Sequence, residues 1–268
     1  MSIISASRRN DIPAFHHAWL MERIREGYVE MRNRAGQTQR VSLDPADVDC
    51  LVLWTKDIRP MLDSGELDEL AELGIPFYVQ HTLTGYDTSI ERGLGADKKD
   101  IAAACVELAD RFGAEHLVWR YDPLLTAPGY AVSDHLRDFT YLCRCLEGAT
   151  DEVVTSNLDV YGKLKSRLSA TGIAPLTDTE VAKLVPQMVK IATAHGMRIS
   201  ACSELAFHDY GVAQAHCIDA KRVERVCGHA VDTTKDPTQR RLCGCVRSID
   251  IGWYGHCAHN CIYCYANR

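Results

Sequence analysis

The sequence predicts an α/β protein whose parallel strands form a complete or partial (β/α) barrel of the TIM type. Seven short apolar runs, rich in β-branched and aromatic residues, alternate with segments of helical period. Strands that alternate with helices pair in parallel, with the helices outside. With 268 residues, of which 46% are hydrophobic, the chain has the size of one barrel and can bury a large core.

The expected elements follow one another in a regular order. Strands are expected at 3–6, 49–55, 77–83, 116–121, 152–158, 198–203 and 248–253. Helices are expected near 14–26, 58–73, 98–112, 131–147 and 178–195. In the third helix, Ile101, Cys105 and Leu108 lie three or four residues apart and form one apolar stripe. That stripe is the face expected to pack on the sheet.

Two segments interrupt the alternation. Residues 27–47 predict a hairpin or surface loop around Ala35-Gly36. Residues 205–247 are polar, irregular and rich in cysteine, and they are long for a loop without structure of its own. We therefore divide the chain into a barrel body, 1–204, and a cysteine-rich segment, 205–268, that completes the barrel. We expect metal to order the second part.

The composition argues against several classes of protein. The net charge is -6, the pI is near 6.0 and no basic block stands out, so nucleic-acid binding is not favoured. No apolar run reaches the length of about 18 residues that a membrane span needs. The N-terminus lacks the features of a signal peptide. We expect a cytoplasmic protein, where thiols stay reduced.

The cysteines are unevenly distributed, with eight of the twelve after residue 200. In a reducing compartment such clustering indicates metal binding or catalysis rather than disulfides. Four others fall within regular strand or helix patterns and are interpreted as packing residues: Cys50, Cys105, Cys143 and Cys145. His16 and His17 are interpreted as packing or surface residues, and so is His81, although its place near the expected rim makes it worth testing.

A compact motif near the C-terminus, C-x3-C-x2-C, contains Cys257, Cys261 and Cys264. A loop with these spacings can turn three thiolates toward one centre. A cubane 4Fe-4S cluster takes four thiolates, one per iron, so three would leave one iron open to a small ligand. Zinc is the alternative, because the three cysteines with His256 or His259 could make a tetrahedral site.

The same motif is similar to that of the radical S-adenosylmethionine superfamily. The resemblance implies that S-adenosylmethionine chelates the open iron and that one electron from the cluster cleaves it to a 5′-deoxyadenosyl radical, which abstracts hydrogen from a substrate. We therefore expect an enzyme with an electron donor such as flavodoxin or ferredoxin. Its substrate is not identified by the sequence, and the acidic balance favours a small molecule or a peptide over nucleic acid. The alternatives are a zinc-dependent hydrolase or zinc-stabilised binding module on a barrel, and a structural or redox iron–sulfur protein.

Five phrases are spread along the chain: SRRNDIPAF at 7–15, LWTK at 53–56, TLTGY at 82–86, WRYDP at 119–123, and the stretch from CGC at 243–245 to Ala266. Together they resemble the family called domain of unknown function 1848 (DUF1848). The resemblance runs essentially from end to end. It implies a relative in fold more than a reaction.

A second resemblance implies the order of the barrel strands. The stretch YGHCAHNCIYCYA at 254–266 is similar to the opening of spore photoproduct lyase-like radical proteins, where it follows the first barrel strand. There, strands that end in Thr-Lys, in small hydroxyl residues and in Asp-Pro come next, matched here by Thr55-Lys56, Thr82 with Thr84, and Asp122-Pro123. These matches precede the cysteines, so the resemblance implies a circularly permuted, radical SAM-like barrel, which rim loops tolerate.

Polar residues at the expected strand ends are the candidates for function, because barrels collect their chemistry at the carboxyl ends of their strands. The candidate catalytic residues are Lys56, Arg120 and Asp122. The candidate cofactor-binding residues are Thr55, Thr82, Thr84, Asn157, Glu204 and Tyr265. Lys56 or Arg120 could pair with a carboxylate, and the threonines could hydrogen-bond ribose or amino groups. The alternative is that these residues, and Asp159 with them, are solvated loop positions or helix caps.

Four further cysteines could bind a second metal centre: Cys202, Cys217, Cys243 and Cys245. Cys227 is a fifth candidate. Four thiolates complete a closed cluster, so we expect a second 4Fe-4S cluster that relays electrons or binds substrate. Structural zinc and inert buried thiols are the alternatives. The chain ends four residues after Cys264, which is short for a helix following a cluster loop and predicts a truncation that removes cofactor contacts.

Overall fold

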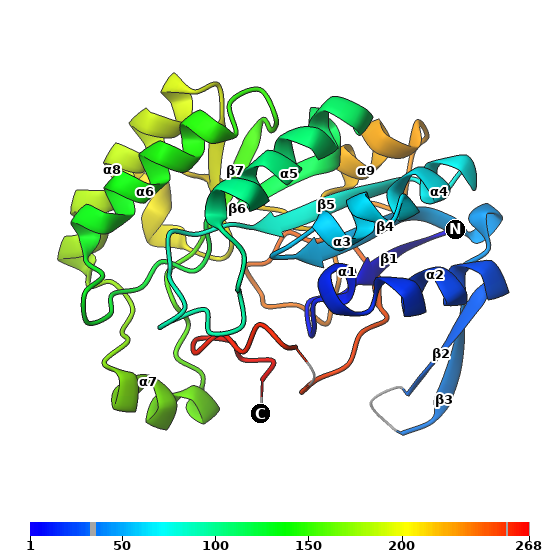
Figure 1. The fold of residues 1–268 in the computed structure, drawn as a ribbon, viewed down its shortest axis with the longest axis horizontal. Coiled ribbons are helices and arrows are strands. Elements are labelled where there is room, and N and C mark those ends of the chain that lie inside the picture. The colour runs from blue at the N-terminus through cyan, green and yellow to red at the C-terminus, as the bar shows by residue number, and fades with distance from the viewer. Residues whose placement is uncertain (33–35, 256, 268) are drawn as a thin grey trace.

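An eight-stranded sheet, parallel throughout, forms the centre of the protein (Figure 1). The computed structural model describes residues 1–32, 36–255 and 257–267. The strands stand in the order β10-β1-β4-β5-β6-β7-β8-β9. Their bounds are β1 (Ser2–Ala6), β4 (Val48–Thr55), β5 (Phe77–Thr82), β6 (Leu117–Arg120), β7 (Glu152–Thr155), β8 (Arg198–Ala201), β9 (Ala213–Gln214) and β10 (Ile249–Asp250). The last strand of the chain therefore pairs with the first.

The α/β class and the parallel sheet agree with the prediction, and a strand lies at each of the seven expected places. Some strands end earlier than expected, because polar residues at their carboxyl ends leave the sheet. After β7, the backbone carbonyl of Ser156 accepts from Leu124 N at 2.7 Å. The side chain of Asn157 donates to Leu176 O at 2.9 Å. The strand ends are thus used to fix the loops of the rim.

Helices connect the strands, and Figure 1 shows α5, α6 and α8 running beside the sheet. Their bounds are α1 (Ile12–Phe15), α2 (His17–Glu26), α3 (Arg59–Asp63), α4 (Glu66–Glu72), α5 (Lys98–Phe112), α6 (Val132–Cys145), α7 (Lys165–Thr171), α8 (Asp178–Ala194) and α9 (Ala220–Cys227). The helix expected near 58–73 is two helices, because Gly65 adopts a left-handed φ of 73° between them. Helix α7 was not expected from the sequence.

The expected hairpin at 27–47 is present. Strands β2 (Tyr28–Arg32) and β3 (Thr38–Ser42) pair in antiparallel fashion, with Val29 opposite Val41. Ala35, at the expected turn, lies outside the described residues.

The two faces of the sheet bury different partners, as the alternation of side chains along a strand requires. On β4, Leu51 and Leu53 join the larger apolar core with the helices. Cys50 and Val52 belong to a second core on the opposite, inner face. That inner face is covered by residues 215–246, so the cysteine-rich segment fills the interior of the curved sheet.

The segment 205–247 has more regular structure than its sequence indicated. It contains a 3-10 helix (Leu205–Tyr210), strand β9 and helix α9. Ile218, Val223 and Val246 pack against the inner face of the sheet. Apolar packing therefore orders part of a segment whose order we had assigned to metal.

A buried arginine fastens helix α9 beneath the sheet. Arg222 is only 2% exposed. Its Nη2 contacts Asp151 Oδ1 at 2.7 Å and Glu152 Oε2 at 3.2 Å. Its Nη1 donates to Glu115 O at 2.9 Å. Because a guanidinium is costly to bury without partners, these contacts fix both the helix and the arginine.

The residues interpreted as packing residues lie mostly inside the protein. Cys50, Cys105 and Cys143 are buried, and Cys145 is half-buried. All twelve cysteines are free thiols. His81 on β5 is fully buried, and neither ring nitrogen has a partner among the described residues. Burial lowers the pKa of His81 to about 4, which keeps it neutral. In the part of the chain that the structure describes, no helix is long and apolar enough to cross a membrane.

Candidate functional site

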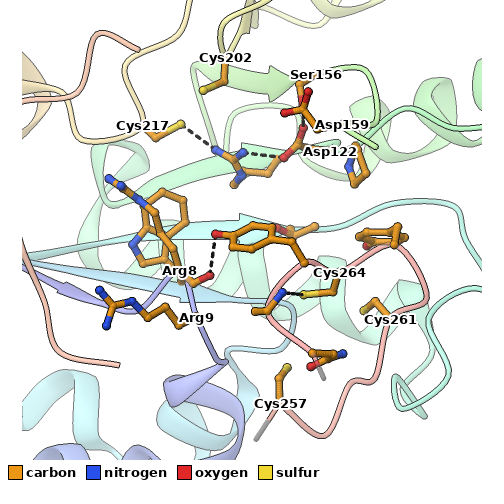
Figure 2. Close-up of a pocket in the computed structure, with 18 of the residues that line it drawn as sticks. Arg8, Arg9, Asp122, Ser156, Asp159, Cys202, Cys217, Cys257, Cys261 and Cys264 are labelled. Atoms are coloured by element: carbon orange, nitrogen blue, oxygen red, sulfur yellow. Dashed lines mark hydrogen bonds and ion pairs between the residues drawn. The ribbon is translucent and has the colours of Figure 1, made fainter. Parts of the chain in front are cut away.

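A cavity of about 670 Å³ opens at the carboxyl ends of the strands, a size typical of small-molecule sites. It is lined by residues that follow β1, β4, β6 and β7 and by the C-terminal loop. All seven cysteines expected to bind metal line it: Cys202, Cys217, Cys243, Cys245, Cys257, Cys261 and Cys264. Figure 2 shows Cys202 and Cys217 on one side of this cavity and the three C-terminal cysteines on the other.

The C-terminal loop is held by backbone pairing with the loop that follows β5. Glu91 and Cys261 form an antiparallel bridge. Ile262 N donates to Ile90 O at 3.0 Å. Gly93 N donates to His259 O at 2.7 Å. These bonds set the positions of the three thiols, of which Cys261 is buried and the other two are half-buried.

Gly93 is required at this contact for steric reasons. A Cβ atom there would lie 1.9 Å from Ala258 O and 2.8 Å from His259 Cα. Real Cβ atoms do not come so close to backbone, so any side chain at this position would push the cysteine loop away.

Glu91 lies beneath the cysteine loop and is 1% exposed. Its carboxylate contacts Lys56 Nζ and Lys98 Nζ, each at 2.6 Å. It also accepts from Thr84 Oγ1 at 3.0 Å and Tyr263 Oη at 2.6 Å. Burial alone would raise the pKa of Glu91, but the two lysines outweigh it and lower the pKa to about 2.

Asp11 joins the N-terminal part of the chain to the same loop. Its Oδ2 faces His259 Nε2 at 2.8 Å and accepts from Lys56 N at 2.7 Å. Its Oδ1 accepts from Ala14 N and caps helix α1. His259 Nδ1 has no partner among the described residues. The other histidine of the zinc alternative, His256, lies outside the described residues.

The three candidate catalytic residues all line the cavity, and each has a partner within the protein. Lys56 pairs with Glu91. Arg120 pairs with Asp122 Oδ2 at 2.6 Å and places its Nη1 3.1 Å from Cys217 Sγ. Asp122 also accepts a hydrogen bond from Ser156 Oγ. Figure 2 shows Asp122 and Cys217 joined in this way across the guanidinium.

Four of the six candidate cofactor-binding residues line the cavity: Thr55, Thr82, Asn157 and Tyr265. Tyr265 Oη donates to Arg8 O at 3.1 Å. Thr84 and Glu204 are not among the described residues that line it. Thr84 is bound to Glu91 instead. Glu204 lies beside Asp159, and burial together with that neighbour raises the pKa of Glu204 to about 7.

The second group of cysteines assembles from separate segments. The thiol of Cys217 interacts with those of Cys202 and Cys245, and these contacts lower its pKa. The thiol of Cys243 likewise interacts with Cys202 and Cys245, which lowers its pKa. Each of the four thiols therefore lies near enough to interact electrostatically with two others, and all four line the same cavity. Cys227 lies at the end of α9 and donates to His229 O at 3.3 Å instead.

Neither group of thiols has the geometry of a formed metal site. Among the described residues, no group of three or more His, Cys, Asp or Glu side chains is arranged so that it could hold a metal ion. All seven of these thiols border one cavity.

A comparison with family models identifies the chain's relatives. A model described as domain of unknown function (DUF1848) matches residues 3–266. The chain belongs to the DUF1848 family. Searches of curated proteins and of solved structures gave no match. The phrases that indicated DUF1848 from the sequence contribute residues to the cavity wall, among them Arg8, Lys56 and Arg120.

Sequence reasoning missed several groups that build this DUF1848 site. Glu91, Asp11 and Arg8 were not among the candidates, although all three adjoin the cavity or its loop. Arg8 follows β1 directly, so the rule that placed the other candidates at strand ends could have found it. Glu91 lies within a loop and carried no such signal.

Proposed function

We propose that this DUF1848 protein is a radical S-adenosylmethionine enzyme on an open, circularly permuted (β/α) barrel. The single observation that carries the proposal is the cysteine loop, whose three thiols face a cavity at the carboxyl ends of parallel strands. The order of the sheet supports it, because β10, which precedes the cysteine loop, lies beside β1 although it is last in the chain.

The donor set fits a cluster with one open iron. Cys257, Cys261 and Cys264 would each bind one iron of a 4Fe-4S cluster. The loop supplies three thiols, and the fourth iron would be left to S-adenosylmethionine. When bound, the reduced cluster supplies the electron that cleaves this cofactor and starts radical chemistry.

The surrounding residues of the chain orient these groups and offset their charge. The described lining of the cavity carries six lysines and arginines, Arg8, Arg9, Lys56, Arg120, Lys163 and Arg240, but three aspartates, Asp11, Asp122 and Asp159. This difference, six minus three, is positive in a protein of net charge -6. A positive cavity favours an anionic cluster and the carboxylate of the cofactor.

Glu91 and Asp11 act on the loop rather than on a substrate. Both are buried acceptors for groups that adjoin the cysteines, namely Tyr263 and His259. Their work would be to hold the thiols in place and to keep water from the reacting groups. Trp54 and Tyr265 add aromatic surface to the cavity wall. The substrate is proposed to be a small molecule or a peptide, with a flavodoxin or ferredoxin as electron donor.

The proposal is tested by anaerobic reconstitution with iron and sulfide, followed by EPR of the reduced protein with and without S-adenosylmethionine. We expect the cofactor to change the EPR spectrum and dithionite to release 5′-deoxyadenosine. The variant Cys261→Ala should abolish both effects, whereas Cys145→Ser, at a half-buried helix thiol, should retain them. Protein that takes up zinc and no iron, or a spectrum indifferent to the cofactor, would refute the proposal.

A further inference from the structure

Four thiols outside the C-terminal loop meet at the cavity although they are far apart along the chain. Cys202 follows β8 and Cys217 follows β9. Cys243 and Cys245 precede β10. Each thiol interacts with two of the others, in the order Cys202, Cys217, Cys245, Cys243 and back to Cys202. Four sulfurs gathered in this way are a soft donor set, suited to an iron–sulfur cluster, zinc or copper(I).

Three arginines surround these thiols. Arg120 Nη1 lies 3.1 Å from Cys217 Sγ, and Arg240 Nη2 lies 3.7 Å from Cys202 Sγ. The guanidinium of Arg8 interacts electrostatically with Cys245, Cys217 and Cys243. Arg120 is buried and Arg8 is half-buried, whereas Arg240 is exposed and pairs with Asp159. Neutral thiols would offset little of the cost of desolvating Arg8 and Arg120, whereas metal-bound thiolates carry the negative charge that would balance them.

The guanidinium of Arg8 has a hydrogen-bond donor that an anion could use. Its guanidinium carbon lies 5.0 Å from the ring centroid of Trp54. Its Nη2 is buried and has no hydrogen-bond partner among the described residues. Figure 2 shows the Arg8 side chain extending along the side of the cavity that holds Cys217. A negatively charged centre at the four thiols would satisfy this orphaned donor.

The sheet holds part of the group in position without any metal. The carbonyl of Cys217 accepts from Tyr78 Oη at 2.9 Å and from Gln80 Nε2 at 2.7 Å, both on β5. Ile218 N donates to Cys245 Sγ at 3.4 Å. Backbone N–H groups directed at cysteine sulfur are among the features that tune iron–sulfur clusters.

We infer that Cys202, Cys217, Cys243 and Cys245 bind a second 4Fe-4S cluster whose charge Arg8, Arg120 and Arg240 offset. A cluster is favoured over zinc because the four thiols border open cavity volume, which a cubane needs and a single ion enclosed by its ligands does not. Every iron of this centre has a protein thiolate. It therefore has no open iron for S-adenosylmethionine and is independent of the C-terminal loop.

The test removes the first site and asks whether the second remains. The variant Cys257→Ala/Cys261→Ala/Cys264→Ala is reconstituted anaerobically with iron and sulfide. We expect about four irons and four sulfides per chain, one iron for each remaining thiolate. The EPR spectrum of the reduced protein should not change on addition of S-adenosylmethionine. Because the first site is absent, a failure of the proposed function would not affect this result.

Two further variants are made in the same triple-alanine background. Adding Cys217→Ala and Cys243→Ala should reduce iron to near zero. Adding Cys50→Ala, a thiol in the same inner core but away from the cavity, should leave iron unchanged. Circular dichroism establishes that all three proteins are folded. No iron in the triple variant, zinc in its place, or iron that survives loss of Cys217 and Cys243 would each overturn the inference.

The reduction potential of the second centre tests the role of the arginines, because a purely structural role would not change it. In the triple-alanine background, Arg8→Met should make the reduction potential of the centre more negative, because the reduced cluster carries one more negative charge and loses a nearby cation. Arg25→Met should leave the potential unchanged, since Arg25 does not line the cavity and pairs with Glu69 at the surface. Equal potentials in the two variants would contradict the role assigned to Arg8.

Discussion

The substitution Glu91→Gln tests whether a buried carboxylate holds the cysteine loop in place. The amide keeps the size of the side chain but removes the charge that faces Lys56 and Lys98. The pKa of Glu91 falls from an ordinary 4.5 to about 2 in the folded protein. At about 1.4 kcal/mol per pH unit, that difference corresponds to roughly 3 kcal/mol of stability. Breaking a buried ion pair by removing one partner costs about 3–5 kcal/mol. The stability estimated from the pKa of Glu91 therefore agrees with the usual cost of breaking such a pair.

The lower end of that range is expected, because the two lysines retain some access to water. Their side chains are 13% and 24% exposed, compared with 1% for Glu91. Urea unfolding at pH 7, followed by circular dichroism, measures the loss. The matched control is Glu69→Gln, which breaks the exposed pair with Arg25 and should cost less than about 1 kcal/mol.

The pH dependence of the free energy of unfolding provides a second, independent test of the same prediction. Because the folded-state pKa of Glu91 is lowered, its contribution is fully present above pH 4.5 and is lost as the pH falls toward 2. The difference in free energy of unfolding between wild type and Glu91→Gln should therefore be constant above pH 5 and shrink below pH 4.5. A difference under about 1 kcal/mol at pH 7, or one that does not shrink in acid, would refute the reasoning.

Two further substitutions test contacts that position the cavity. Gly93→Ala should displace residues 258–259, reduce stability by about 1–3 kcal/mol and lower the iron bound by the C-terminal loop, as measured by urea unfolding and iron analysis. Gly95→Ala, where a Cβ meets open space, should have neither effect, and equal iron in the two variants would contradict the packing argument. Arg222→Met should destabilise the protein by about 1–3 kcal/mol, because the buried Glu152 loses one of its two cations while Arg198 stays in place. Arg225→Met, at an exposed position of the same helix, should be close to neutral in the same unfolding experiment.

The cavity contains two groups of cysteines, and the parts of the chain that supply them differ. The C-terminal group comes from one short loop that is held by a neighbouring loop. The second group is brought together by the cysteine-rich segment as it covers the inner face of the sheet. Their shared cavity places both groups where the strands end, which is where parallel α/β sheets collect their ligands.

The sequence alone determined the class of fold and the places of the main elements. The strands at 49–55 and 77–83 were predictable because apolar, β-branched runs record local burial, and the helix at 98–112 because its apolar stripe has a period set by helix geometry. The spacing of Cys257, Cys261 and Cys264 was equally local. A loop so short brings its own thiols near one another in any fold.

Tertiary structure decided the rest, because it depends on residues far apart in the chain. We grouped Cys202 with Cys243 because both were cysteines left outside the C-terminal motif, but no spacing predicts how they meet. Nor does any spacing predict that Glu91 lies beneath Tyr263 and between two lysines. Helix α9 and strand β9 were missed for the same reason, since their packing partners are on the inner face of a distant sheet. Long-range contacts fix which polar groups become buried together. That burial turns an ordinary arginine or glutamate into part of a site.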